Sequence, residues 1–343
     1  DGTGLRDEQR VSASTRISGT SLSLSLPPPG TMSAVNAPPY AAVVVTFNHV
    51  DTLPATLQAI AALDPGPAET VLIDNASLDG SADAAARWRH GHLVRMSRNV
   101  GFAAAVNHGL RMTTSPWILL LNPDCAPRRD YVARLFAAAT DRPETEKVGS
   151  ITGRLLRTGD EPGAQPVLDA AGMVVTPSGR HHDRGAGTPD DGRFRRPAWV
   201  FGGTGAATLY RRVALDDVAY PDGQVLAESF FAYREDAELA WRLQWRGWRC
   251  LYAPAAVALH RRGLRPEAGR RRNAMINAHS VRNRFLLRAH CADWAWHLRC
   301  FPWWLGRDLL VLAACLTVER RSLSAFHDLW RLRADALRRR RWI

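Results

Sequence analysis

Residues 41–46, Ala-Ala-Val-Val-Val-Thr, and residues 70–73, Thr-Val-Leu-Ile, are short apolar runs on either side of a helical pattern over 52–63. Continuous apolar runs of this length are typical of strands that are buried on both faces of a parallel sheet. The pattern continues with a helix near 80–90, a strand over 93–96, a helix over 103–112 and a strand over 117–121. This alternation predicts an α/β fold in which helices flank a mainly parallel sheet.

The composition changes on either side of this α/β region, which we expect to span residues 39–262. Residues 1–38 are rich in Ser, Thr, Gly and Pro, so we predict that they are disordered. Met32 precedes a small-residue stretch, and we expect the natural chain to start there, with residues 1–31 as an addition. Residues 263–343 are predicted to form a helical extension, with helices over 273–290, 294–318 and 322–341.

The second half of the α/β region has a weaker pattern. Residues 150–200 are rich in Gly, Arg and Asp, which indicates strands and long loops, and residues 200–211 are predicted to be a glycine-containing strand pair. A helix is expected within 226–250, and two apolar strands over 250–252 and 257–259 complete the predicted core.

Charge is distributed unevenly along the 343-residue chain, whose formal net charge is +12. Lys147 is the only lysine, and arginines cluster over 261–272 and 320–341. A basic C-terminal end predicts an anionic partner, which is phospholipid head groups, a diphosphate or nucleic acid. Nucleic-acid binding is disfavoured, because the basic and aromatic residues are confined to the tail rather than spread over a folded platform.

The cysteines and the longest apolar segment bear on the compartment. Five scattered cysteines without a Cys-x-x-Cys pair predict reduced thiols and a cytosolic setting. The apolar run Leu309–Val318 is about half of the roughly 20 residues that a transmembrane helix requires. Because this run is too short, we expect a chain that does not span a membrane. No cleavable signal peptide is evident.

Polar residues follow the predicted strands, at the sheet edge where ligands bind in α/β proteins. These sets are Thr46-Phe47-Asn48, Asp74-Asn75, Arg98-Asn99 ahead of a helix that carries Asn107, and Asn122-Pro123-Asp124. A fifth set, the acidic pair Glu235-Asp236, stands between an aromatic run and a helix. Apolar surroundings raise the pKa of a carboxyl group, which suits a general base, although acidic residues also stabilise the first turn of a helix.

Taken together, these five sets resemble the family 2 glycosyltransferases of the GT-A fold over residues 40–262, and most closely their rhamnosyltransferase-like branch. The resemblance implies an inverting displacement on a nucleotide-sugar donor, assisted by Mg²⁺ or Mn²⁺. A soluble acceptor from secondary metabolism and a UDP-sugar donor remain open alternatives, and we favour dTDP-L-rhamnose. A catalytically inactive scaffold is disfavoured by the presence of Asp124 and Asp236.

The resemblance assigns the donor contacts residue by residue. Asp74 corresponds to the family's nucleoside contact, with Thr46 nearby, and an Asx turn is the structural alternative for Asp74. Arg98 and Asn99 correspond to the nucleotide side, although Asn99 could simply cap a helix. The remaining predicted donor-binding residues are Asn48, Asn75, Asn107, Asn122, Gly203 and Arg242.

Asn122-Pro123-Asp124 takes the place of the family's Asp-x-Asp metal motif, so the resemblance makes Asp124 a metal ligand. Asn122 departs from that motif with a neutral and weaker ligand, and we expect it to contact the ribose or a coordinated water. His260 follows a strand at a position where related enzymes ligate the metal or contact the diphosphate. The alternatives are a strand-ending turn for the motif and a structural role for the histidine.

The same resemblance makes Asp236 the catalytic base and Glu235 the residue that orients it or contacts the acceptor. Arg242 is expected to pair with an acid of this site or to hold the diphosphate. The loop Gly202–Gly205 is similar to the family's small-residue loop that lets a sugar approach the backbone, and its alternative is a hairpin or bulge.

The C-terminal extension contributes the last expectation. Tryptophans interspersed with arginine are typical of a helix that lies at a membrane interface, and six of the twelve tryptophans lie after residue 293: Trp294, Trp296, Trp303, Trp304, Trp330 and Trp342. We therefore expect peripheral contact with the inner face of the cell membrane, where a polyprenyl-diphosphate-linked acceptor of cell-envelope polysaccharide synthesis would reside. The alternatives are packing on the catalytic domain or on the second subunit of a homodimer.

Overall fold

A computed structural model describes residues 37–140, 147–157, 165–261 and 274–342. Contacts group residues 36–343 into one compact unit. The predicted disordered segment 1–38, except for its last two residues, lies outside the described residues, as does most of the arginine cluster over 261–272.

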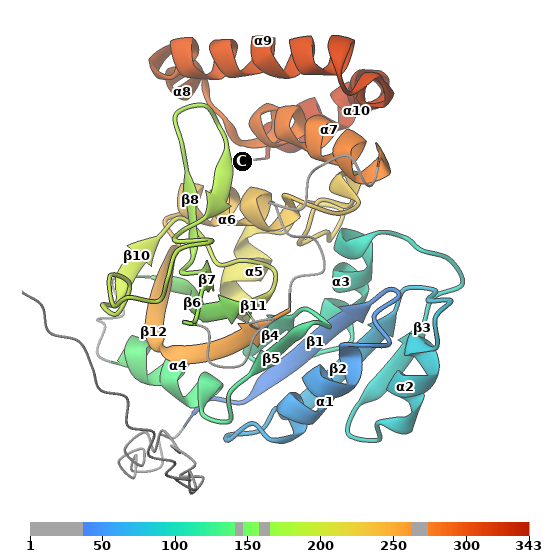
Figure 1. Ribbon diagram of the computed structural model, residues 1–343, viewed down its shortest axis with the longest axis vertical. Coiled ribbons are helices and arrows are strands. Elements are labelled where there is room, and N and C mark those ends of the chain that lie inside the picture. The colour runs from blue at the N-terminus through green and yellow to red at the C-terminus, as the bar shows by residue number, and fades with distance from the viewer. Residues whose placement is uncertain (1–36, 141–146, 158–164, 262–273, 343) are drawn as a thin grey trace, which may run out of the picture. The chain divides into compact units, whose positions relative to one another are not determined.

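Four parallel strands form one half of the central sheet (Figure 1). These are β1 (Tyr40–Thr46), β2 (Glu69–Asp74), β3 (His92–Arg95) and β4 (Trp117–Leu121). β1 lies between β2 and β4, and its last residue, Thr46, is in register with Asp74, the last residue of β2. The carboxyl ends of these strands therefore meet at one edge, as the sequence predicts.

The other half of the sheet is mixed. β11 (Ala207–Arg211) runs antiparallel between β4 and β6 (Val148–Arg157), and β12 (Arg249–His260) lies parallel to β6. Shorter strands extend this half, namely β5 (Cys125–Pro127), β7 (Leu168–Ala170) and β10 (Ala198–Val200). A separate hairpin consists of β8 (Met173–Val175) and β9 (His181–Asp183).

Two details of the predicted second half are wrong. The strands within 200–211 do not pair with each other, because β10 joins β12 whereas β11 inserts between β4 and β6. The two strands predicted over 250–252 and 257–259 are parts of the single strand β12, which carries an irregularity between Ala253 and Val257. Both errors concern long-range pairing, which local sequence patterns do not encode.

Helices cover both faces of the sheet. One face packs on α1 (Leu53–Ala61), α2 (Ser81–Arg87) and α4 (Tyr131–Thr140), and the other on α3 (Phe102–Arg111), α5 (Arg212–Val218) and α6 (Glu235–Trp245). Successive residues of β1 alternate between these layers, with Ala42 and Val44 in the first and Val43 and Val45 in the second. This double burial explains the continuous apolar run, and the predicted α/β class is confirmed.

The C-terminal part is helical, as predicted. It comprises α7 (Ala274–Cys291), α8 (Trp294–Arg299), α9 (Phe301–Thr317) and α10 (Ser324–Arg340), with a short 3₁₀ turn, η5, at Arg320–Leu323. The single helix predicted over 294–318 is broken at Cys300, and Pro302 stands in the first turn of α9, where its missing N–H is tolerated. α7 packs against α6 and α10. None of the helices among the described residues has the length and apolar character needed to cross a membrane.

Candidate functional site

The ends of β1 and β2 form the first part of the site. Thr46 and Asp74 lie side by side in the parallel ladder, and both are buried. The Asp74 carboxylate accepts a hydrogen bond from the Ser77 backbone N–H at 3.4 Å, so the structural alternative of an Asx-type turn is present as well. The Thr46 hydroxyl is buried with no partner among the described residues, which leaves a polar atom beside Asp74 that a ligand could satisfy.

The loops after these two strands are joined by Asn48. This exposed residue has a left-handed backbone (φ 58°), which asparagine tolerates better than most residues. Its Oδ1 accepts a hydrogen bond from Leu78 N at 2.8 Å, and its own N–H donates to Ser77 Oγ at 3.0 Å. Asn48 therefore shapes the loop pair that borders Asp74.

Asn75 and Asn99 connect this edge to α3. The buried Asn75 side chain donates to Asn99 Oδ1 at 2.9 Å and accepts from Val100 N at 3.0 Å. Asn99 Oδ1 also accepts from Gly101 N at 2.9 Å. Both amides hold the turn into the helix, while the neighbouring Arg98 is exposed and lines a cleft of about 510 Å³.

Three of the predicted donor contacts point into the interior instead. Asn107 is buried; its Nδ2 donates a hydrogen bond to Leu226 O at 2.8 Å, and its Oδ1 accepts one from Leu226 N at 2.9 Å. A Cβ atom at Gly203 would lie 2.2 Å from Thr208 Oγ1, so this glycine is packed against β11 rather than open to a ligand. Arg242 is 2 % exposed. The geometry therefore gives none of the three a direct contact with a ligand at the strand edge.

His260, Asp124 and Asp169 form a buried chain of hydrogen bonds at the end of β12. His260 Nε2 lies 3.1 Å from Asp124 Oδ1, and His260 Nδ1 lies 2.7 Å from Asp169 Oδ2. Burial alone would lower the pKa of His260, but the two carboxylates outweigh it and raise this pKa to about 9. Asp169 was not among the predicted site residues, because its partner stands far away in the chain.

This chain suits a divalent metal ion. Asp124 Oδ1 and His260 Nε2 lie 3.1 Å apart, so a carboxylate oxygen and an imidazole nitrogen converge on one point. A divalent ion such as Mn²⁺ would bind there by replacing the proton that the two atoms share. A metal-bound histidine usually donates its other ring N–H to a carboxylate, which is the position of Asp169. The described residues contain no cage of three or more protein ligands, and two ligands suit an ion that is shared with phosphate oxygens.

The acidic pair stands at the start of α6, behind a strained turn. Phe231, Tyr233 and Arg234 all have positive φ angles, of 63°, 72° and 75°. Asp236 accepts hydrogen bonds from Gly205 N at 3.1 Å and Ala237 N at 2.7 Å. Such strained backbone persists only where the surroundings hold it, and it is concentrated at functional sites.

Burial changes the acidity of both carboxyl groups. It raises the pKa of Glu235 well above the ordinary value, with a further contribution from the charge of Asp236. Burial likewise raises the pKa of Asp236, and the hydrogen bond from Gly205 N opposes this. Glu235 Oε2 is buried without a partner among the described residues. The pair can therefore accept a proton more readily than exposed carboxylates.

The strained turn is held from α7 by Asn283. Its amide nitrogen lies 2.9, 2.8 and 2.7 Å from the carbonyl oxygens of Phe230, Ala232 and Tyr233. Arg282 also donates to Phe230 O, at 2.8 Å. No local pattern marks Asn283 as important, because its partners lie about fifty positions earlier in the chain.

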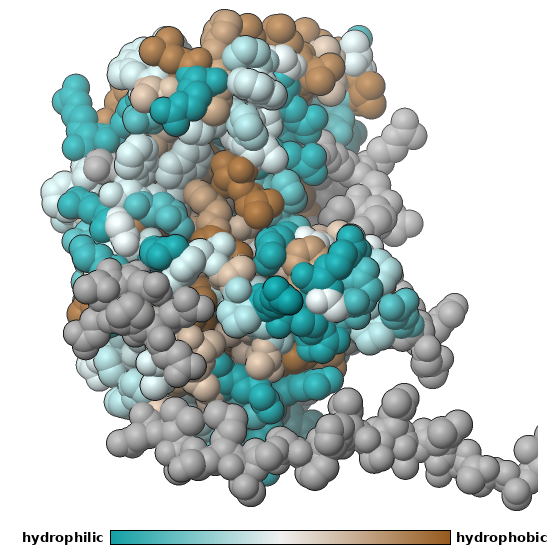
Figure 2. Space-filling view, turned by 90° about the vertical axis from the view of Figure 1, so that its left-hand side faces the viewer, coloured by the Kyte–Doolittle hydropathy of each residue, from teal (hydrophilic) through white to brown (hydrophobic). Residues whose placement is uncertain are grey.

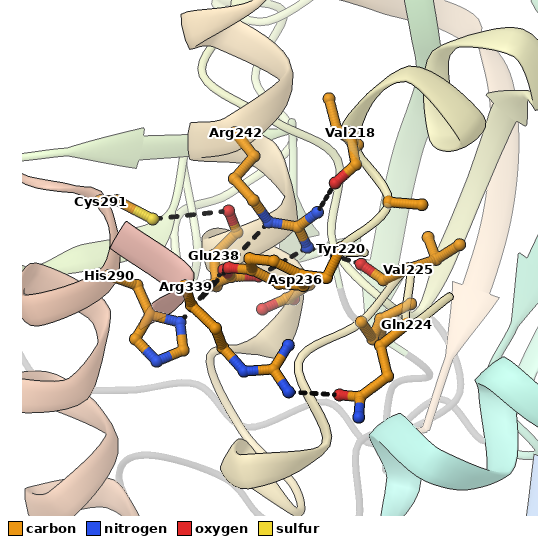
Figure 3. Close-up of polar contacts among 12 residues, drawn as sticks. Val218, Tyr220, Gln224, Val225, Asp236, Glu238, Arg242, His290, Cys291 and Arg339 are labelled. Carbon is orange, nitrogen blue, oxygen red and sulfur yellow. Dashed lines mark hydrogen bonds and ion pairs between the residues drawn. The ribbon is translucent and has the colours of Figure 1, made fainter. Parts of the chain in front are cut away.

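A buried polar cluster ties α6 to the C-terminal helices (Figure 3). Glu238 accepts from Arg242 Nε at 3.0 Å and Nη2 at 2.7 Å, and its Oε1 also accepts from the Tyr220 hydroxyl and lies 3.3 Å from His290 Nδ1 of α7. Arg339 of α10 donates to Gln224 Oε1 at 3.0 Å. Burial alone would raise the pKa of Glu238, but Arg242 and His290 outweigh it and lower this pKa to about 2.

Known proteins that resemble this chain include glycosyltransferases and a polysaccharide synthase. A family model described as "Glycosyl transferase family 2" matches residues 41–219. The N-acetylglucosaminyl-diphospho-decaprenol L-rhamnosyltransferase of Mycobacterium tuberculosis H37Rv is 28% identical over 301 residues, which cover 81% of this chain and 92% of that protein. A poly-beta-1,6-N-acetyl-D-glucosamine synthase of Staphylococcus aureus is 23% identical over 63% of this chain and 48% of its own length.

Solved structures share the fold. GalNAc-T7 with UDP, GalNAc and Mn²⁺ superposes with a TM-score of 0.56 at 16% identity, covering 76% of this chain and 49% of that one. The mannosyltransferase PcManGT from Pyrobaculum calidifontis, in complex with GDP-Man and Mn²⁺, has a TM-score of 0.53 at 18% identity, covering 90% and 86%. The predicted GT-A fold is confirmed by these similarities.

Proposed function

The chain belongs to glycosyl transferase family 2, and from this premise we propose that it moves a sugar from a nucleotide-sugar to an acceptor hydroxyl with inversion at the anomeric carbon. The observation that carries the proposal is that two adjacent residues, Gly205 and Ala206, form hydrogen bonds to the proposed base and to the proposed metal-binding turn. Gly205 N donates to Asp236 at 3.1 Å, and Ala206 O accepts from Asn122 N at 2.9 Å. The proposed base and the Asn122–Asp124 turn are thus held by the same segment, Gly205-Ala206.

Asp236 acts as the general base in this proposal. It takes the proton of the acceptor hydroxyl as that oxygen bonds to the anomeric carbon, and the bond from that carbon to the donor phosphate breaks. The nucleoside diphosphate leaves with the electron pair of the broken bond. Burial raises the pKa of Asp236, which makes it a stronger base than an exposed aspartate. Glu235 next to it is proposed to orient Asp236 or to contact the acceptor.

Asp74 and Thr46 are proposed to bind the nucleoside, since their polar atoms lie together at the ends of two paired strands. Asn48, Asn75 and Asn99 shape the loops around this position through the hydrogen bonds described above. Arg98 is exposed in the adjoining cleft and is available to an anionic group of the donor.

Asp124 and His260 are proposed to hold Mg²⁺ or Mn²⁺, with Asp169 fixing the orientation of the imidazole. When bound, the ion would offset the charge that develops on the leaving diphosphate. Mn²⁺ in the solved GT-A relatives supports this assignment.

The proposed donor is dTDP-L-rhamnose, and the proposed acceptor is a polyprenyl-diphosphate-linked saccharide in cell-envelope polysaccharide synthesis. Support comes from the M. tuberculosis relative, whose name specifies L-rhamnose transfer to a decaprenol-linked sugar. This acceptor implies work at the inner face of the cell membrane. UDP-sugars are the second candidate, because a solved relative carries UDP.

A turnover assay tests the function. Purified protein with dTDP-rhamnose and a short-chain N-acetylglucosaminyl-diphospho-polyprenol should release dTDP and form a rhamnosylated lipid. Asp236→Asn should slow turnover by about 10²–10⁴-fold and retain donor binding. No release of nucleotide from any donor of a dTDP-, UDP- and GDP-sugar panel, with folded protein and this acceptor present, would contradict the proposal.

A further inference from the structure

Helix α9 has an apolar outer surface. None of its exposed positions carries a charge, and its two charged residues, Arg307 and Asp308, are both partly buried. Asp308 forms an ion pair with Arg288 of α7. A helix on the surface of a soluble domain ordinarily has the reverse arrangement, with its polar residues facing water.

The exposed apolar residues of α8 and α9 are large. Trp294 and Leu298 are each 78% exposed and Leu310 is 66% exposed. With Trp303, Leu309 and Leu316, which are also exposed, they form what we call the docking face. Hydrophobic surface gathers along the top of the molecule in Figure 2, the end at which α8 and α9 lie in Figure 1. An apolar surface of this kind marks a place of contact with another molecule or with a membrane.

We infer that the docking face inserts into the interface of an anionic membrane. α9 has 17 residues, which corresponds to about 25 Å, and it is too short and insufficiently apolar to cross a bilayer. A helix of this kind lies in the plane of the interface, with its apolar side among the acyl chains and tryptophan near the head groups.

Arginines lie within and just beyond the docking face. Arg299, the last residue of α8, stands between Leu298 and Trp303 of the face, and Arg320 and Arg321 stand just beyond its end. All three arginines are exposed. Residues 294–342 contain ten arginines against four acidic residues. Basic residues near an anionic lipid surface are attracted to it and strengthen binding. This charge selects anionic lipid over a second copy of the chain, because a two-fold contact would bring the same arginines face to face.

The docking face also has a structural route to the candidate site. The Arg288–Asp308 pair joins α9 to α7, and Asn283 of α7 holds the turn ahead of Glu235. Membrane docking would therefore orient the helix that supports the acidic pair. The docking itself is independent of the proposed function, whereas the delivery of a lipid-linked acceptor to that pair rests on it.

Vesicle co-sedimentation of the full chain tests the inference. We expect wild-type protein to bind phosphatidylglycerol-containing vesicles and to bind pure phosphatidylcholine vesicles at least tenfold more weakly. Leu309→Gln/Leu310→Gln should weaken binding to the anionic vesicles by about tenfold or more, because two large side chains leave the acyl region. Arg320→Gln/Arg321→Gln should weaken binding to the anionic vesicles at low salt, and binding by this variant should depend less on salt concentration than binding by wild type.

Val213→Gln on α5 is the matched control, since Val213 is 55% exposed but lies outside the docking face. It should bind vesicles as wild type does. Equal vesicle binding by the leucine variant, or no binding by folded wild type, would overturn the inference. A wild-type dimer that the leucine substitutions convert to a monomer, without vesicle binding, would assign the face to self-association instead. Donor turnover with a water-soluble acceptor should be unchanged in the leucine variant, so loss of docking and failure of the proposed function give different results.

Discussion

Glu238→Gln tests whether the buried cluster of Figure 3 stabilises the α6 segment that follows the acidic pair. Glu238 is wholly buried and bonds Arg242 through both of its oxygens. The variant would leave the Arg242 guanidinium buried without its counter-charge. Breaking one partner of a buried ion pair costs about 3–5 kcal/mol.

The pKa of Glu238 gives an independent value for the stability that the Glu238–Arg242 ion pair contributes. A fall from its ordinary value of 4.5 to about 2 corresponds to about 3 kcal/mol of stability from the charged form. Because the folded-state pKa is the lower one, this stability is present above about pH 4.5 and is lost as the pH falls toward 2. The free energy of unfolding of wild type should therefore exceed that of Glu238→Gln by about 3 kcal/mol at pH 7. The two free energies should converge as the pH falls toward 2.

Urea unfolding monitored by circular dichroism at a series of pH values measures this difference. Asp83→Asn is the control, since Asp83 pairs with Arg95 at 3.2 Å on the surface, where such pairs contribute at most about 1 kcal/mol. A difference between wild type and Glu238→Gln below 1 kcal/mol, or one that does not vary between pH 7 and pH 3, would refute the reasoning.

Three further predictions concern the candidate site. Asp236→Asn should lower kcat by about 10²–10⁴-fold with donor affinity unchanged. In a pH–rate profile, the wild-type rate should fall in acid through a pKa above that of an exposed aspartate. An unchanged kcat in the variant would show that Asp236 is not the base. Asp169→Asn should weaken Mn²⁺ binding by about 10–100-fold in calorimetry while the circular dichroism spectrum is retained. An unaltered Mn²⁺ affinity would show that Asp169 does not support metal binding. Asn283→Ala should lower kcat more than it changes the donor KM, because the turn ahead of α6 loses its support; an effect on thermal stability alone would make Asn283 merely structural.

The first half of the fold follows from local sequence because its signals are local. The runs at 41–46, 70–73 and 117–121 are continuous since both faces of each strand are buried, and the polar residues after them lie at the expected edge. The second half depends on pairings between distant segments. Nothing near residues 200–211 indicates that β11 inserts between β4 and β6.

The candidate site shows the same division. Asp74, Asp124 and Asp236 could be selected by their place after strands and at a helix start. Asp169 and Asn283 could not, because each acts on a residue or turn from a distant part of the chain. Arg242 was expected at the site from its spacing to the acidic pair, yet α6 turns its side chain toward Glu238 and the interior. A helix places neighbouring residues on different faces, and only packing decides which face meets the ligand.

The most direct test of the account is calorimetric titration of dTDP-rhamnose into wild type and Asp124→Ala, each with Mn²⁺ and with EDTA. The account predicts that wild type binds the donor with Mn²⁺, binds it much more weakly with EDTA, and loses the metal-dependent part in the variant. Donor binding of equal strength in all four titrations would contradict a metal site at Asp124 and His260.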